Sequence, residues 1–103
     1  MSRSVKIAET SDLSPGGCKA VEVEGQTIAL FNVGGTFYAI NGNCTHVGGP
    51  LGEGTLDGEI VTCPWHGAQF NVTTGAVLRP PAGSDEESFP VKIEGSDVLV
   101  ELD

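Results

Sequence analysis

The 103-residue sequence predicts an all-β fold, and three observations lead to it. Short segments alternate between apolar and polar residues with a period of two, as half-buried strands do. Clusters that contain glycine, asparagine or proline separate these segments and supply turns. No stretch keeps a helical period for longer than a turn or two. A chain of this length is expected to form one domain with one modest core and a radius of gyration of about 13 Å.

The N-terminal part of the chain predicts four strands joined by short turns. Residues 18–23 alternate with a period of two, and Glu24-Gly25 connects them to a partner strand, which predicts a hairpin. Gly34-Gly35 then leads into a β-branched and aromatic run that ends at Asn41-Gly42. The expected strands are Val5–Ile7, Cys18–Val23, Gln26–Val33 and Thr36–Ile40.

A glycine-rich segment, residues 48–58, separates these strands from a second set. It holds five glycines and one proline, so it excludes a helix and lets the backbone approach a ligand closely. Asn71–Gly75 predicts a hairpin turn, and Gly95–Asp97 predicts the turn of a closing hairpin. The expected strands are Glu59–Thr62, Gln69–Val72, Ala76–Leu78, Phe89–Glu94 and Val98–Leu102.

Two short motifs, Cys44-Thr45-His46 and Cys63-Pro64-Trp65-His66, contain both histidines of the protein. Two thiolates with two imidazoles fit a tetrahedral zinc ion, or a [2Fe–2S] cluster in which one iron takes both sulfurs and the other both imidazoles. Common zinc modules pair Cys with Cys and His with His in separate knuckles. The mixed knuckles here favour the binuclear cluster. Its expected ligands are Cys44, His46, Cys63 and His66.

Around these residues the chain resembles the Rieske family, whose motif is Cys-x-His followed, after a spacer, by Cys-x-x-His. The likeness extends beyond the ligands, over residues 44–51 and 63–70. It implies a Rieske fold in which an antiparallel β-sandwich base, about residues 1–42 and 76–103, carries a small inserted cluster-binding subdomain, about residues 43–75. It also implies one [2Fe–2S] cluster per chain, with the cysteines on the inner iron and the histidines on the outer iron, which takes the electron.

The resemblance also gives roles to residues around the ligands. Pro80-Pro81 stands where Rieske domains carry a loop that shields the cluster, although two prolines also make a stiff connector. Trp65 is expected to cover the cluster loop, with core packing and a docking face as alternatives. High-potential Rieske proteins place serine and tyrosine hydroxyls against cluster sulfurs at the positions of Ala68 and Phe70, which have none. We therefore expect a potential near the lower end of the Rieske range of about −150 to +300 mV.

The likeness is nearest to the small Rieske ferredoxins of bacterial ring-hydroxylating dioxygenases. It implies a low-potential carrier that passes single electrons from a flavin-dependent NAD(P)H reductase to a terminal Rieske oxygenase in aromatic hydrocarbon catabolism. Both histidines are committed to metal and the acidic residues form no paired motif, so we expect no catalytic residues and no enzyme activity. The alternatives are the small Rieske-like subunit of a nitrite reductase and, more weakly, a structural zinc-binding module.

Composition narrows the partners and the location. With 14 acidic and 5 basic residues the net charge is −9 and no basic patch exists, so we expect no nucleic acid partner. The N-terminus lacks the apolar run of a signal peptide, and no stretch reaches the roughly eighteen apolar residues of a membrane span. Cys18 is left over once two cysteines are ligands, which excludes an intrachain disulfide and is typical of a reducing compartment. We expect a cytoplasmic monomer in which Cys18 is a buried or half-buried structural thiol.

Overall fold

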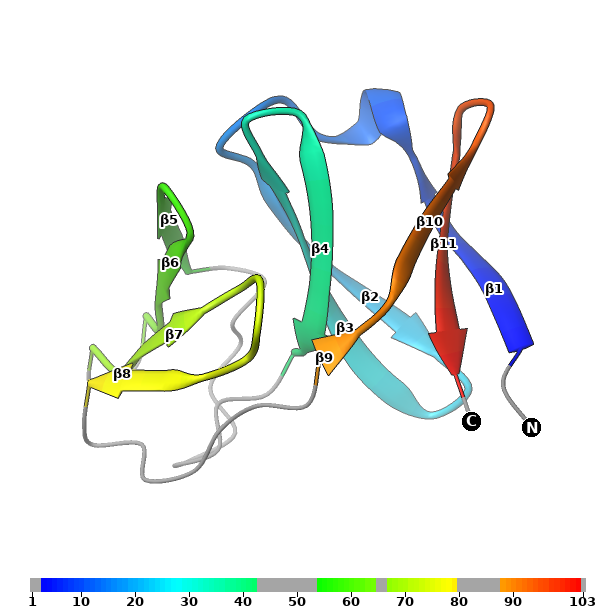
Figure 1. Ribbon diagram of the computed structural model, residues 1–103. Helices are drawn as coiled ribbons and strands as arrows, with labels where there is room; N and C mark the ends of the chain where they lie inside the picture. Colours follow the sequence, from blue (N-terminus) through cyan, green and yellow to red (C-terminus); the bar gives the residue numbers. More distant parts are fainter. Residues whose placement is uncertain (1–2, 43–53, 65–66, 80–87, 103) are drawn as a thin grey trace.

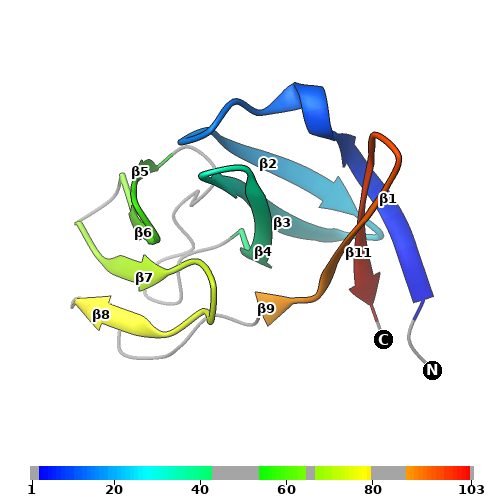
Figure 2. The same cartoon turned by 45° about the horizontal axis from the view of Figure 1, so that its top comes forward.

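The computed structural model describes residues 3–42, 54–64, 67–79 and 88–102, which form three antiparallel sheets (Figure 1). Two sheets make up a base, and a third, smaller sheet lies beside them in both views (Figures 1 and 2). The described residues include one short 3-10 helix, Thr10–Asp12, and no helix that is long and apolar enough to cross a membrane. The all-β prediction, with an antiparallel sandwich as its base, is confirmed.

The sheets are built from strands that are mostly sequence neighbours. The first sheet, in the order β1-β11-β10, contains β1 (Arg3–Glu9), β11 (Asp97–Leu102) and β10 (Val91–Glu94). The second sheet, in the order β2-β3-β4-β9, contains β2 (Cys18–Val23), β3 (Gln26–Val33), β4 (Thr36–Asn41) and β9 (Ser88–Phe89). The third sheet, in the order β5-β6-β7-β8, contains β5 (Thr55–Asp57), β6 (Ile60–Thr62), β7 (Gln69–Asn71) and β8 (Val77–Arg79).

Two-residue turns set the register of the second sheet. Val23 pairs with Gln26 and Val33 pairs with Thr36, so each turn has only two central residues. Glu24 and Gly25 have φ angles of 50° and 84°, and the two glycines of the next turn also have positive φ. Positive φ at both central positions is the type I′ geometry, whose twist matches that of the flanking strands. The hairpin predicted at Glu24-Gly25 and the turn predicted at Gly34-Gly35 are confirmed.

Strand β3 is buried on both of its faces. Side chains alternate across a strand, so Ile28 and Leu30 point to one side of the sheet while Ala29 and Phe31 point to the other. None of these four side chains is exposed to solvent. The second sheet therefore packs against the first sheet with one face and against the third sheet with the other.

Two apolar cores follow from this arrangement. The base core lies between the first and second sheets and consists of Ile7, Ala8, Val23, Ile28, Leu30, Phe37, Ala39, Phe89, Val98, Val100 and Leu102. The junction core lies between the second and third sheets and consists of Ala29, Phe31, Ile40, Val61, Cys63, Ala68, Phe70 and Val72. The junction core includes one of the predicted metal ligands, Cys63.

Asn32 is a buried polar residue whose hydrogen bonds are satisfied. Its side chain donates to the Leu13 carbonyl at 2.9 Å and accepts from the Gly35 backbone N–H at 2.8 Å. Its own backbone N–H donates to the Gly17 carbonyl at 3.1 Å. Because buried polar groups need partners, this one residue fixes the segment before β2 against the β3–β4 turn.

Three features differ from the expected elements. The run Phe89–Glu94 is divided at Pro90, which has no N–H for a ladder, so β9 pairs with β4 whereas β10 pairs with β11. Thr55–Asp57, at the end of the glycine-rich segment, forms a strand where a loop was expected. Strand β8 pairs with β7, so the third sheet continues past residue 75, where the chain was expected to return to the base.

Candidate metal centre

Cys63 is the predicted ligand that the described residues include. It follows β6 directly, its side chain is only 1% exposed, and it packs in the junction core. The other predicted ligands, Cys44, His46 and His66, lie outside the described residues. Trp65 and the Pro80-Pro81 pair also lie outside them, so their expected roles stay predictions.

The second motif lies in a loop between β6 and β7, which we call the ligand loop. Cys63 and Ala68, the first and last residues of this loop, form its neck. The Cys63 backbone N–H donates to the Ala68 carbonyl at 2.7 Å, so the first and last residues of this segment are one hydrogen bond apart. Gly67 has a φ of 74°, a left-handed conformation that glycine adopts without a steric penalty. A loop closed in this way holds Cys63 at a fixed place relative to the sheet.

The surroundings of Cys63 fit a metal-bound thiolate. A thiolate in an apolar core is costly unless a cation compensates its charge, and metal ligation provides that compensation. Within the described ranges no group of three or more His, Cys, Asp or Glu side chains could hold a metal ion, since three of the predicted ligands lie beyond them. The two-thiolate, two-imidazole donor set suits a [2Fe–2S] cluster, and Cys63 fits as one of its ligands.

Comparison with known families decides what kind of domain this is. The family model described as "Rieske [2Fe-2S] domain" matches residues 3–92. The chain belongs to the Rieske family. The cofactor of this Rieske domain is a [2Fe–2S] cluster, and the Rieske fold expected from the two motifs is confirmed.

Individual relatives match the Rieske domain over nearly its whole length. The ferredoxin subunit of biphenyl dioxygenase from Pseudomonas sp. (strain KKS102) is 40% identical over 98 residues, which cover 94% of this chain and 90% of that protein. A chain in a solved complex of reduced oxygenase and oxidized ferredoxin in carbazole 1,9a-dioxygenase is 38% identical, with a TM-score of 0.89 over 94% of this chain and 91% of that one. The ferredoxin of Sphingomonas yanoikuyae B1 is 29% identical, with a TM-score of 0.92 over 98% and 100% of the two chains.

Ala68 and Phe70 complete the wall of the junction core beside Cys63. Both side chains are fully buried, and Phe70 lies opposite Val61 in the β6–β7 ladder. Neither side chain can donate a hydrogen bond. These two members of the junction core therefore offer no hydroxyl to a cluster sulfur.

Cys18 lies where the base meets the third sheet. Its half-buried side chain packs against the junction core, and the Leu56 backbone N–H of β5 donates a hydrogen bond to its sulfur. Burial raises the pKa of the Cys18 thiol, and this hydrogen bond offsets part of the rise. The prediction that the Cys18 thiol is buried or half-buried is confirmed, and its structural role stays a prediction. The Leu56 contact itself could not be expected from the sequence, because β5 was not predicted.

The described basic side chains of the base form local ion pairs. Arg3 pairs with Glu24, and Lys6 lies 3.1 Å from Asp97. The other described pairs are Lys6 with Glu9, Lys19 with Asp12 and Lys92 with Glu94. All of these pairs are exposed and contribute little stability. They place the described lysines next to carboxylates, so no basic patch forms among the described residues of the base.

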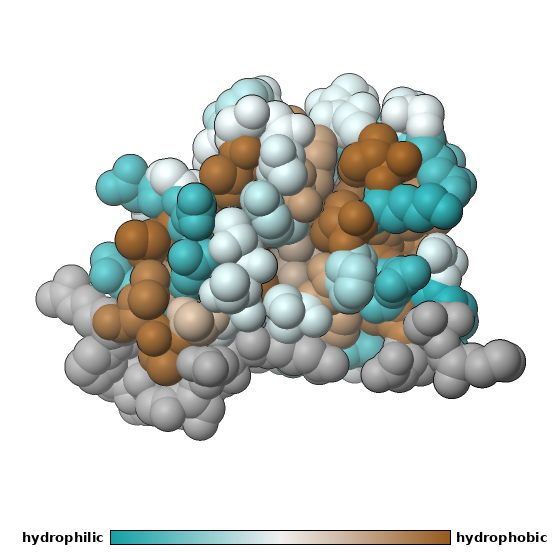
Figure 3. Space-filling model, in the orientation of Figure 1, coloured by the Kyte–Doolittle hydropathy of each residue, from teal (hydrophilic) through white to brown (hydrophobic). Residues whose placement is uncertain are grey.

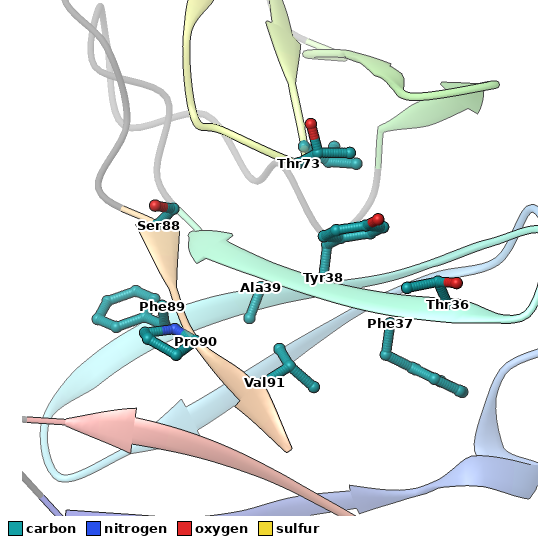
Figure 4. Close-up of a pocket in the computed structure, with 10 residues that line it drawn as sticks. Thr36, Phe37, Tyr38, Ala39, Thr73, Ser88, Phe89, Pro90 and Val91 are labelled. Carbon is teal, nitrogen blue, oxygen red and sulfur yellow. The ribbon is translucent and has the colours of Figure 1, made fainter. Parts of the chain in front are cut away.

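A pocket of about 420 Å³ opens where β9 and β10 diverge from β4 (Figure 4). Figure 4 shows Tyr38 on the side of β4 that faces Thr73, whereas Phe37 lies on the opposite side of the strand. The lining residues are Thr36, Phe37, Tyr38, Ala39, Val72, Thr73, Ser88, Phe89, Pro90 and Val91. The described lining residues offer hydroxyl and apolar groups, and Cys63 is not among them.

The outer surface of the third sheet carries exposed apolar area. Leu78, on the edge strand β8, is 50% exposed. In the view of Figure 3, hydrophobic residues lie over this sheet with hydrophilic residues beside them, and a second hydrophobic group lies over the base. Single exposed apolar residues are common on protein surfaces, so Leu78 alone identifies no binding site.

Proposed function

We propose that this Rieske domain is a diffusing electron carrier between a flavin-dependent NAD(P)H reductase and a terminal ring-hydroxylating oxygenase. The observation that carries the proposal is the likeness to a dioxygenase ferredoxin subunit, 40% identical over 94% of this chain and 90% of the relative. The Rieske domain acts as an electron-transfer component and not as a catalytic subunit. A nitrite reductase subunit and a structural zinc module are not favoured by these relatives.

The proposed ligand set is Cys44 and Cys63 on the inner iron and His46 and His66 on the outer iron. When bound, the cluster takes up and releases one electron, and its two neutral imidazoles make reduction easier than in an all-cysteine cluster. The residues of the Rieske domain supply rigidity. Strands β6 and β7 and the Cys63–Ala68 hydrogen bond restrict the loop that bears two of the four ligands. A site that changes little between oxidation states needs little reorganisation when the electron arrives.

The partners are expected to present basic surfaces. The net charge of −9 favours encounter with a positively charged protein face. We further propose that the protein is a cytoplasmic monomer and that the chain is one domain. The junction core supports the single domain, because base residues such as Phe31 and third-sheet residues such as Phe70 pack in the same cluster.

The test combines metal analysis with a reconstituted electron chain. Anaerobically purified protein should contain two iron and two sulfide per chain, as a [2Fe–2S] cluster requires, and should give a Rieske-type electron paramagnetic resonance spectrum when reduced. With NADH, a flavoprotein reductase and a biphenyl-type oxygenase, product formation should require this protein. His66→Cys should lower the potential or prevent cluster assembly, whereas Cys18→Ser should leave both unchanged. One zinc per chain without sulfide, or turnover that is unaffected when the protein is omitted, would refute the proposal.

A further inference from the structure

A side-chain hydrogen bond crosses the neck of the ligand loop on the face away from the junction core. Thr62 is the last residue of β6, Gln69 is the first residue of β7, and the two lie opposite each other. The Gln69 side-chain amide donates to the Thr62 hydroxyl oxygen at 3.2 Å, and the bond is partly buried. One residue further along each strand, the Cys63–Ala68 backbone hydrogen bond closes the same neck at 2.7 Å.

The two faces of this neck are held by different interactions. On the inner face, Val61, Cys63 and Phe70 pack in the junction core. Because side chains alternate along a strand, Thr62 and Gln69 project from the outer face, where packing against the base cannot hold them. Their hydrogen bond therefore supplies on the outer face the restraint that apolar contacts supply on the inner face.

The pairing of β7 with β8 is irregular beside Gln69. The β7–β8 register shifts between Gln69 and Phe70, which pair with Arg79 and Val77, so Leu78 has no partner on β7. An extra residue of this kind disrupts the ladder locally. The outer neighbour of β7 is thus irregular beside Gln69, and the bond to Thr62 fixes the start of β7 to β6.

We propose that Gln69 is a positioning residue for the cluster, acting through Thr62 on the neck between Cys63 and Ala68. The inference rests on the proposed ligand set, in which Cys63 and His66 both belong to this loop. A fixed neck limits the range of loop geometries and so keeps the two ligands at one spacing. Loss of the bond broadens that range, which changes the spectrum and potential of the cluster and speeds iron release.

Variants at both ends of the hydrogen bond test the proposal in the loaded protein. Thr62→Val removes the acceptor while keeping the shape and the strand preference of the side chain, and Thr62→Ser restores the oxygen. Gln69→Leu removes the donor. Glu59→Ala is the matched control, because Glu59 accepts from the Asn71 side chain at 3.4 Å across the far end of the same hairpin.

The expected results separate the two ends of the hairpin. Thr62→Val and Gln69→Leu should each broaden the resonance spectrum, displace the midpoint potential and speed iron loss to a chelator by about fivefold, the factor for one ordinary net hydrogen bond. The double variant should be no faster than either single variant, because both remove the same bond. Thr62→Ser and Glu59→Ala should match the wild type.

If Thr62→Val keeps the wild-type spectrum, potential and rate of iron release, this inference is wrong, while the proposed ligand set is unaffected. An equal effect in Glu59→Ala would also overturn the inference, because any loosening of the hairpin would then suffice. A wild-type protein without a Rieske-type spectrum would overturn the proposed ligand set and this inference with it.

Discussion

Hydroxyl groups introduced beside Cys63 test whether missing donors hold the potential low. Ala68 and Phe70 are fully buried in the junction core. We expect Ala68→Ser and Phe70→Tyr each to raise the midpoint potential, because a hydroxyl that donates to a cluster sulfur stabilises the more negative reduced state. A bond that favours reduction by about 1 kcal/mol corresponds to about 40 mV for a one-electron couple, so the double variant should gain about 80 mV.

Burial adds a second quantity that the same variants report. Both side chains have no solvent exposure, so water cannot replace a missing partner for the new hydroxyl. A buried hydroxyl without a partner costs about 1–3 kcal/mol of unfolding free energy. If the hydroxyl reaches a sulfur, the potential rises and stability stays near the wild-type value. If it does not, stability falls and the potential does not change.

Ala29→Ser provides the control for this experiment. Ala29 is equally buried in the junction core but lies on β3 of the base. We expect this variant to lose about 1–3 kcal/mol of stability without a change in potential. Voltammetry and anaerobic denaturant unfolding measure the two quantities. An unchanged potential in the double variant, or a rise in Ala29→Ser as large as that in Ala68→Ser, would refute the reasoning.

Three further predictions concern docking, the two cores and the free thiol. Electron transfer to the oxygenase should slow as salt rises from about 0.05 to 0.5 M, because salt screens exposed charges; rates that ignore ionic strength would indicate apolar docking. Leu30→Ala and Phe31→Ala should each cost about 2–5 kcal/mol of stability. Hydrogen exchange should distinguish the two variants, because only Phe31→Ala should increase the exchange rates of the β6 and β7 amides more than those of the β10 and β11 amides. Equal increases in both pairs of strands would contradict the separation of the cores. Alkylation of Cys18 should require a higher pH than that of an ordinary cysteine, because burial raises its thiol pKa and leaves less thiolate at a given pH; a reaction profile centred at the ordinary pKa would contradict this.

Local patterns were sufficient for the hairpins of the base. The bounds of β2 and β3 agree with the sequence prediction, because alternation and a two-residue turn fix both ends of each strand. Thr55–Asp57 could not be found in this way. It is three residues long and lies among glycines, and it becomes a strand because Leu56 lies opposite Val61 and packs against the junction core. That contact depends on the tertiary fold, which overrides the local preference.

Some features of the candidate site could be predicted from the sequence, and others could not. The spacing of the motifs predicts the ligand types, which stay a prediction, and the structure shows Cys63 buried directly after a strand. The hydrogen bond between Thr62 and Gln69 could not be predicted, because an amide and a hydroxyl seven positions apart form no motif. Only the register of β6 against β7 brings these two side chains together.

The junction core limits how the cluster-bearing part of the molecule could be moved into another protein. Three of its eight buried residues, Ala29, Phe31 and Ile40, belong to strands of the base. Residues 43–79, which include all four proposed ligands, would, if cut out alone, leave Val61, Phe70 and Val72 without the base residues that cover them, and so small a unit has no second core to compensate. A graft therefore needs an acceptor sheet with a matching small, aromatic and branched pattern. Exchange between homologous domains is expected to succeed when that face of β3 and β4 travels together with the third sheet.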